Sequence, residues 1–349
     1  MEHAEHGPHC CPPQGKKKPW YLNPLFLTLT ATFVLLFLSF RFPLLFEFRA
    51  AFSEYSRIIW LPILLGFFAG GLVDYYVPQE YISKILARKT KRTVFYSAGL
   101  GLLASACSHG IIALSMELHK KGASGPAVVS FLLASPWANL PITFLLIGFF
   151  GWKGILIIFA ALFVSISTGL IFQALDRRGL IERNRHSVSV ASDFSIAKDI
   201  KKRFRDYRLT PAQLSQDFQG ILKGTYLLAE MVLWWILIGV LLASLVSAFI
   251  PQAWFHRFMG PSFLGLVVTL LVATVFEICS EGTSPLAFEI YKQTGAFGNA
   301  FAFLMGGVVT DYTEVGLVWI NLGKKTALWM LAVTIPQVIV LGWIFNLIL

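Results

Sequence analysis

The feature that most constrains this chain is a series of nine apolar segments, each of about 20 residues or more. The segments are 26–46, 58–77, 94–118, 126–150, 152–175, 226–250, 263–281, 296–320 and 326–349. A helix of about 20 apolar residues crosses the hydrocarbon core of a bilayer, and lipid-exposed backbone must be helical or part of a closed barrel. The sequence therefore predicts an all-α, polytopic integral membrane protein with about 9–10 hydrophobic helical segments.

The charged residues agree with this prediction. They make up 14% of the chain, whereas soluble domains carry about 25%, so an ordinary cytosolic enzyme is excluded. A formal net charge of +10 could indicate nucleic acid binding in a soluble protein. Here the Lys and Arg residues lie between apolar segments, where they indicate topology. We expect a multi-pass protein of the inner (plasma) membrane, with the bilayer as its surroundings and no nucleic acid partner.

Charge also divides the chain into parts. The expected parts are a polar tail at 1–22, a first membrane half at 23–175 with a repeat from about 58, a basic linker at 176–224, and a second membrane repeat at 225–349. The positive-inside rule places the tail and the linker in the cytoplasm. Three apolar segments lie between the basic residues near Arg92 and the linker, so one of them must re-enter or be broken. The two halves would then have inverted topologies.

An internal repeat supports this organisation. Two Cys-Ser-x-Gly motifs align at an offset of 279 − 107 = 172 residues. The aligned pairs are Cys107 with Cys279, Ser108 with Ser280, His109 with Glu281, and Asn139 with Asp311. Inverted repeats with interrupted helices are typical of secondary transporters, whose substrate sites lie near the bilayer midplane at the repeat interface. We therefore expect these eight residues to bind the substrate.

Three acidic residues in apolar surroundings are candidates for proton coupling: Glu281, Asp311 and Glu314. A carboxylate at the bilayer centre costs about 3 kcal/mol on insertion scales, so it is a functional hypothesis by default. The structural alternative is that the cysteines are small packing residues and that the neighbouring prolines and glycines only kink helices. That alternative explains the acidic residues poorly, unless they lie at the membrane interface.

The N-terminal tail contains a second group of candidate ligands. His3, His6, His9, Cys10 and Cys11 have side chains that suit Zn²⁺ or Cu. No spacing typical of a structural zinc site is present. These residues are candidates for metal capture by a flexible tail, with a tail of no functional consequence as the alternative.

The run 106–110, together with 121–123, 131–139 and the second Cys-Ser-x-Gly, resembles the large bacterial family of predicted permeases that includes the ArsP organoarsenical efflux proteins. The resemblance covers nearly the whole chain. It implies a multi-pass inner-membrane permease, and the ArsP members export trivalent organoarsenicals. Many members carry Cys-Ser-Cys-Gly, whereas His109 and Glu281 hold the third position here, which leaves borderline metals or a different solute open.

These observations predict a secondary transporter that exports a thiophilic metal, metalloid or organoarsenical in exchange for protons. Cys107 and Cys279 would bind the substrate, and no cofactor is expected. The chain contains no Walker A, Rossmann or His-Glu-x-x-His motif, which disfavours ATP-driven pumping and known metalloprotease chemistry. Two alternatives stay open: a transporter of an unrelated small solute, and an integral-membrane enzyme that uses Cys or His. The sequence does not determine the oligomeric state.

Overall fold

The structure is a computed structural model of the 349-residue chain. It describes residues 23–76, 92–101, 123–182, 210–276 and 280–349, with single residues or short pieces at 111, 114–116, 118–119, 184 and 205. Every regular element within these residues is a helix, which confirms the all-α prediction.

The helices of the first half follow one another closely in the sequence. They are α1 (Pro24–Arg41), the short 3₁₀ helix η2 (Pro43–Leu45), α2 (Phe46–Tyr76), α4 (Arg92–Gly101), α6 (Gly125–Ala138), α7 (Leu140–Phe150) and α8 (Trp152–Arg177). A capping side chain followed by proline begins several of them. At α1, for example, the Asn23 side chain accepts a hydrogen bond from the Leu25 N–H at 2.9 Å, and Pro24 occupies the first helical position.

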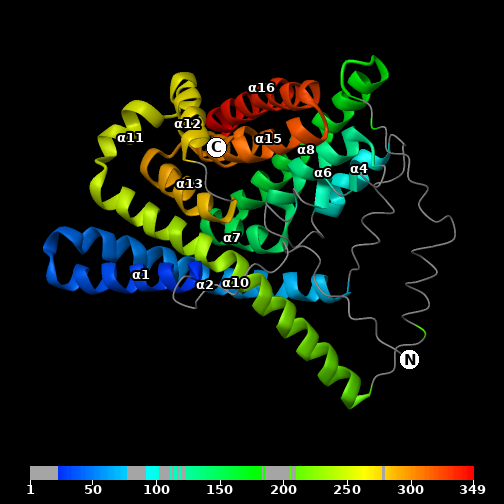
Figure 1. Ribbon diagram of the computed structural model, residues 1–349. Helices are drawn as coiled ribbons and strands as arrows, with labels where there is room; N and C mark the ends of the chain where they lie inside the picture. The colour runs from blue at the N-terminus through cyan, green and yellow to red at the C-terminus, as the bar shows by residue number, and fades with distance from the viewer. Residues whose placement is uncertain are drawn as a thin grey trace.

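In the second half, the described residues form seven helices. They are α10 (Pro211–Phe249), α11 (Gln252–Met259), α12 (Phe263–Val275), α13 (Ser280–Thr294), α14 (Phe297–Thr310), α15 (Tyr312–Asn321) and α16 (Lys324–Ile348). The helix α10 begins earlier than its apolar segment, because Thr210 and Pro211 provide a cap and a first turn inside the range expected to be linker. Figure 1 shows α1 and α2 side by side, with α10 packed across both.

The membrane-spanning character of the chain is confirmed by helix length and composition. Among the described residues, six helical stretches are long and apolar enough to cross a bilayer, and the number rises to eight if each of two bent pairs counts as one span. The bent pairs are α6 with α7, at 47°, and α11 with α12, at 106°. Large apolar side chains face outward on the peripheral helix α1, where Phe33 is 72% exposed. Such a surface suits lipid.

The helix boundaries of the two halves agree at the same offset of 172 residues. The starts of α6, α7 and α8 at 125, 140 and 152 correspond to those of α14, α15 and α16 at 297, 312 and 324. Gly151 and Gly323, which precede α8 and α16, both have positive φ angles, of 60° and 121°. The packing corresponds too, since α6 lies against α4 and α8, and α14 lies against α12 and α16.

The corresponding helices α8 and α16 run in opposite directions. Lys153, at the start of α8, donates to the backbone oxygen of Leu349 at the end of α16, at 3.4 Å. Glu182, just beyond α8, accepts a hydrogen bond from the Lys325 N–H at the start of α16, at 3.0 Å. We name these two sides of the protein the Leu349 end and the Glu182 end. Antiparallel equivalents are what an inverted repeat requires.

The helices α12 and α13 form a re-entrant hairpin that opens at the Leu349 end. With 13 residues, α12 is about 20 Å long, too short to cross a core of about 30 Å. At its start, the Gly260 oxygen accepts from Asn299 at 2.9 Å, and Asn346 contacts both Asn299 and the Gly298 N–H at 2.7 Å. The segment 263–281, expected as one span, is therefore interrupted before α13, which turns back. The corresponding residues of the first half lie mostly outside the described parts of the chain.

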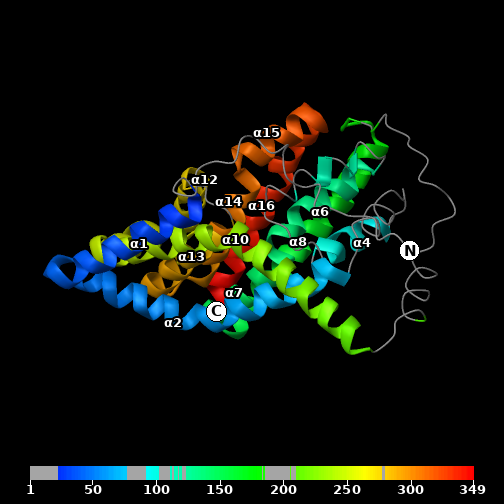
Figure 2. The same ribbon diagram turned by 60° about the horizontal axis from the view of Figure 1, so that its bottom comes forward.

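The polar helix α13 lies inside the protein. It packs against α10, α14, α7 and α11, and Figures 1 and 2 both show it alongside α10. Most of its side chains are buried, including polar ones. A helix of this composition is stable in a membrane protein when surrounding helices shield it from lipid.

Candidate functional site

The first element of the candidate site is the break between α6 and α7. Pro136 and Pro141 flank this break, and each removes a backbone N–H donor. Between them, the Asn139 side-chain oxygen accepts from the Ile142 N–H at 2.9 Å and so caps α7. Because capping uses only the oxygen of the amide, its Nδ2 group can donate elsewhere.

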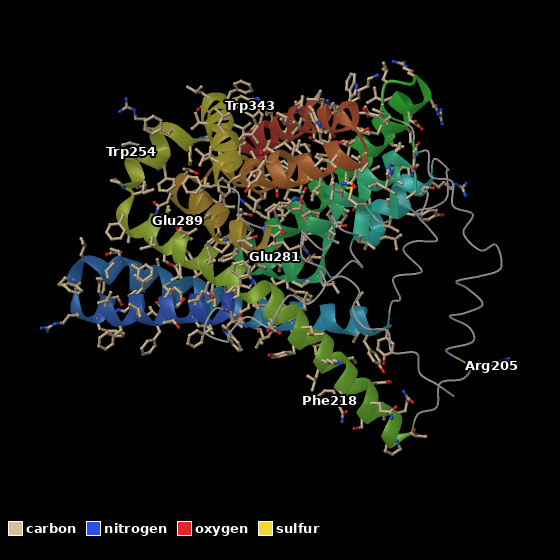
Figure 3. All side chains as sticks on the ribbon, in the orientation of Figure 1. Arg205, Phe218, Trp254, Glu281, Glu289 and Trp343 are labelled. Atoms are coloured by element: carbon tan, nitrogen blue, oxygen red, sulfur yellow. The ribbon has the colours of Figure 1, made fainter. Side chains whose placement is uncertain are left out.

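Glu281 receives that donor. Its Oε1 accepts from Asn139 Nδ2 at 3.4 Å, and its Oε2 accepts from the Ser280 hydroxyl at 3.0 Å. Both Asn139 and Glu281 are buried, at 2% and 1% exposure. Figure 3 shows Glu281 in the interior, in the first turn of α13. The structure thus joins a residue of the first half to a residue of the second, and both were predicted site residues.

The junction of α14 and α15 has a cap like that of the first break, although 297–321 together form one spanning stretch. The Asp311 carboxylate accepts from the Glu314 N–H at 3.1 Å, in the same three-residue spacing as Asn139 and Ile142. Asp311 is partly exposed, whereas Glu314 is buried. In both halves, therefore, a side-chain oxygen caps the helix that follows. The oxygen belongs to an amide in the first half and to a carboxylate in the second.

The first turns of α13 lie between these breaks. The Gly282 carbonyl oxygen would be 2.1 Å from a Cβ at Gly239, so α10 and α13 touch at backbone distance. On another side, Thr283 is 4.0 Å from the Cβ position of Gly307, one turn before the Asp311 break. Two helices, α7 and α13, begin where Asn139 meets Glu281.

The remaining predicted site residues lie outside the described residues. They are Cys107, Ser108, His109 and Cys279, and the tail residues His3, His6, His9, Cys10 and Cys11. In the parts of the chain that are described, no group of three or more His, Cys, Asp or Glu side chains could hold a metal ion. The metal and thiol ligands stay predictions.

Sequence reasoning did not select Glu289, a second buried carboxylate on α13. Its Oε2 accepts from the Tyr55 hydroxyl of α2, and its Oε1 accepts from Gln293 Nε2 at 2.6 Å. The available signal was a glutamate eight residues after Glu281 in a stretch of mixed polarity. Because that stretch contains many polar residues, its composition does not indicate a helix in the interior of a membrane protein.

Comparison with known proteins agrees with the architecture. A family model described as a predicted permease, ArsP_1, matches residues 46–347. A Mycobacterium tuberculosis protein named as a permease, Rv2963, is 24% identical over 253 residues, which cover 67% of this chain and 60% of that protein. The chain thus aligns with less than two thirds of that relative's length.

Two further relatives are matched over most of their length. The UPF0718 protein YcgR of Bacillus subtilis is 23% identical over 80% of this chain and 90% of that protein. The UPF0718 protein MJ0584 of Methanocaldococcus jannaschii is 20% identical over 83% and 92%. No solved structure matches. With a family match over most of its length and a bundle of membrane-spanning helices, the chain belongs to the ArsP_1 family of predicted permeases and is a multi-pass membrane transporter.

Proposed function

We propose that the chain is a secondary transporter that exports a thiophilic metal, metalloid or organoarsenical in exchange for protons. The observation that carries this proposal is the buried contact between Asn139 and Glu281. It joins the two halves at a helix break, which is where alternating-access transporters bind their substrates. A titratable group at such a place can couple its protonation to a change of access.

In this proposal Glu281 carries the coupling proton. As a carboxylate it accepts hydrogen bonds from Asn139 and Ser280. Once protonated, one of its oxygens becomes a donor, so at least one of these bonds must rearrange. Because Asn139 belongs to the other half, the rearrangement would change how the halves are held together.

The substrate ligands would be the two cysteine motifs. Cys107 and Cys279 supply soft thiolates, while Ser108, Ser280 and His109 supply harder donors. Glu281 follows Cys279 by two residues, so a cation on the thiolate and a proton on the carboxylate would oppose each other electrostatically. Such competition is what antiport needs. Asp311 and Glu314 would be a second titratable pair in the equivalent break of the other half.

Transport by purified protein in vesicles tests the proposal. Efflux of a trivalent organoarsenical is measured under an imposed pH gradient, and binding is measured separately. Glu281→Gln should retain binding and lose pH-driven efflux, whereas Cys279→Ser should weaken binding. Glu230→Gln, on an exposed position of α10, is the matched control. Wild-type efflux that ignores the pH gradient would contradict proton coupling, and chemical turnover without efflux would favour the enzyme alternative.

The N-terminal tail has an accessory role in this proposal. His3, His6, His9, Cys10 and Cys11 would gather metal in the cytoplasm before export. Deletion of residues 1–13 should lower the apparent affinity and leave transport in place. Complete loss of activity in a correctly inserted protein would contradict that role.

A further inference from the structure

Glu289 is a buried carboxylate without an ion-pair partner in the described part of the chain. It is 0% exposed, and its two oxygens accept from Tyr55 and Gln293. Hydrogen bonds to neutral donors compensate the burial of a carboxylate only in part. A carboxylic acid group in such a place is a candidate for reversible proton binding.

Aromatic rings enclose the Tyr55 side chain. Its ring meets those of Phe149 and Phe288 edge to face, with centroids 6.2 and 6.0 Å away. Phe149 and Phe288 are themselves stacked at 5.0 Å. These rings come from α2, α7 and α13, so they form an apolar wall where the three helices meet. Within this cluster of rings, the Tyr55 hydroxyl donates its hydrogen bond to Glu289.

An ion pair lies on the outer side of Tyr55. Lys292 and Glu54 are 2.5 Å apart, with side chains 36% and 46% exposed. Lys292 Nζ is 5.4 Å from the centroid of the Tyr55 ring. The ion pair is therefore partly exposed, whereas Tyr55 and Glu289 are both 0% exposed and are hydrogen-bonded to each other in the interior. The neighbouring Tyr291 hydroxyl accepts from Lys153, which places this group at the Leu349 end.

The other titratable groups near this end of α13 are few. Those already described are Glu54, Tyr55, Tyr291, Lys292 and Lys153. The helix α11, which contains His256 and Arg257, also lies near this end, because Gln252 donates to the Gln293 oxygen at 3.2 Å. The helices α7 and α14 and the segment 232–249 of α10, which also pack against α13, contain no titratable side chain. Glu289 is therefore the buried acid of this end among the described residues.

We infer that Glu289 is a second proton-binding site of the transport cycle, loaded from the Leu349 end through the hydroxyl of Tyr55. The inference rests on the proposed proton coupling and adds a second proton-binding residue to it. In the step itself, Tyr55 passes its hydroxyl proton to Glu289 Oε2 and takes one from a hydronium ion, which becomes water, so the tyrosine is unchanged and the carboxylate becomes a neutral acid. Because Tyr55 is 0% exposed, the hydronium ion has to enter past the pair of Glu54 and Lys292. Glu281 and Glu289 are eight positions apart in the sequence, which is about 12 Å along α13.

The bond between Tyr55 and Glu289 also attaches the re-entrant hairpin to α2. Tyr55 belongs to the first half and Glu289 to the second. A proton on Glu289 removes the charge that the tyrosine hydroxyl stabilises, which weakens this attachment. Protonation of Glu289 from the Leu349 end would therefore loosen α13 from α2. At the other end of α13, protonation of Glu281 would control the contact with Asn139.

Proton binding can be measured directly on the purified full-length protein. The readouts are proton uptake as the pH is lowered, and the carboxylic acid C=O band in infrared difference spectra. Glu289→Gln preserves shape and an acceptor for Tyr55, and it should bind one proton fewer and lack one band. Tyr55→Phe should retain the band but delay its appearance after a pH jump by about tenfold or more. Glu47→Gln, exposed on α2 at the same end, is the control and should retain the wild-type band.

Unchanged proton uptake and an unchanged band in Glu289→Gln would overturn the inference. If that variant fails to fold, Glu289→Asp is used instead, because aspartate can still titrate. Its carboxylic acid band should be shifted, and an unshifted band would also overturn the inference. Transport separates this result from the proposed function. If Glu281→Gln loses pH-driven efflux of a trivalent organoarsenical while Glu289→Gln keeps wild-type efflux, only the role of Glu289 is refuted. If efflux by the wild-type protein does not depend on the pH gradient, the proposed proton coupling itself is refuted.

Discussion

Glu182 caps the first turn of α16 from outside that helix. Its Oε2 accepts from the N–H and the hydroxyl of Thr326 at 3.0 and 2.9 Å, and its Oε1 accepts from the Lys325 N–H at 3.0 Å. Gly323 has no side chain to cap the helix, and a Cβ there would lie 2.2 Å from the Glu182 carboxyl carbon. Burial opposes ionisation of Glu182, but these donors outweigh it and hold its pKa below the usual value.

The first prediction is that Glu182→Ala destabilises the protein by about 1 kcal/mol at neutral pH, as loss of a helix cap does. Because the folded pKa is lowered, the stabilisation is present above the unfolded pKa of about 4.3 and is lost as the pH falls through the folded value. Melting temperatures of detergent-purified wild type and variant should therefore converge in acid. Glu230→Ala, on an exposed position of α10, should melt like the wild type at every pH.

The second prediction uses the close contact of α10 with α13. Gly239→Ala would place a Cβ 2.1 Å from the Gly282 oxygen, and neither backbone can move without shifting the site. We expect a loss of about 1–3 kcal/mol, the usual cost of overpacking, and slower transport. Gly316→Ala is the control, because no atom lies within 4 Å of its Cβ position and alanine favours a helix. Equal melting temperatures for the two variants would contradict the contact.

Local features of the sequence were sufficient to predict the helix breaks. The prolines beside Asn139 interrupt an apolar segment, and the structure bends the chain there by 47° between α6 and α7. The glycine pair 306–307 stays helical within α14, and the interruption comes only at Asp311, within a stretch that counts as one span. The contact of Asn139 with Glu281 was not predictable in the same way, because 142 residues separate them. Hydropathy identifies a spanning segment but carries no information about which segments pack together.

The helix α13 was missed for a different physical reason. Its polar residues have the composition of a loop or a surface helix, so the preceding apolar segment was expected to end near Glu281. Inside the protein, Glu289 is satisfied by Tyr55 and Gln293, and the hydroxyls of Thr283 and Ser284 donate to the Ser280 oxygen. Most of these partners lie on α13 itself, and Tyr55 comes from α2. Together they reduce the cost of burying these groups, and a single sequence does not reveal the partner from the distant helix.

The third prediction concerns the inverted topology. A reporter inserted in 176–224 should be cytoplasmic, and one fused after Leu349 should be periplasmic. The structure supports opposite sides, since Lys153 contacts Leu349 at one end of α8 while Glu182 contacts Lys325 beyond its other end. Reporters for both compartments, placed at both sites, check this. The same location for both fusions would refute the inverted arrangement.

The last prediction exchanges the two residues that cap α7 and α15. Asp311→Asn retains a side-chain oxygen for the Glu314 N–H, so the fold should survive, and only a role in proton coupling would be lost. Asn139→Asp likewise retains the cap on Ile142, but it replaces the donor to Glu281, 3.4 Å away, with a second carboxylate. Two carboxylates at that distance do not both ionise readily, so they should share a proton.

The exchange therefore separates capping from coupling. Asn139→Asp should bind one additional proton near neutral pH and move the pH profile of efflux upward, whereas Asp311→Asn should melt like the wild type and show reduced pH-driven efflux. Proton uptake, melting temperature and vesicle flux are measured on both variants. Asn139→Ala loses the cap as well as the donor, so it should be less stable than Asn139→Asp by about 1 kcal/mol. If Asn139→Asp shows wild-type proton uptake and flux, the contact between Asn139 and Glu281 is structural and the coupling proton lies elsewhere.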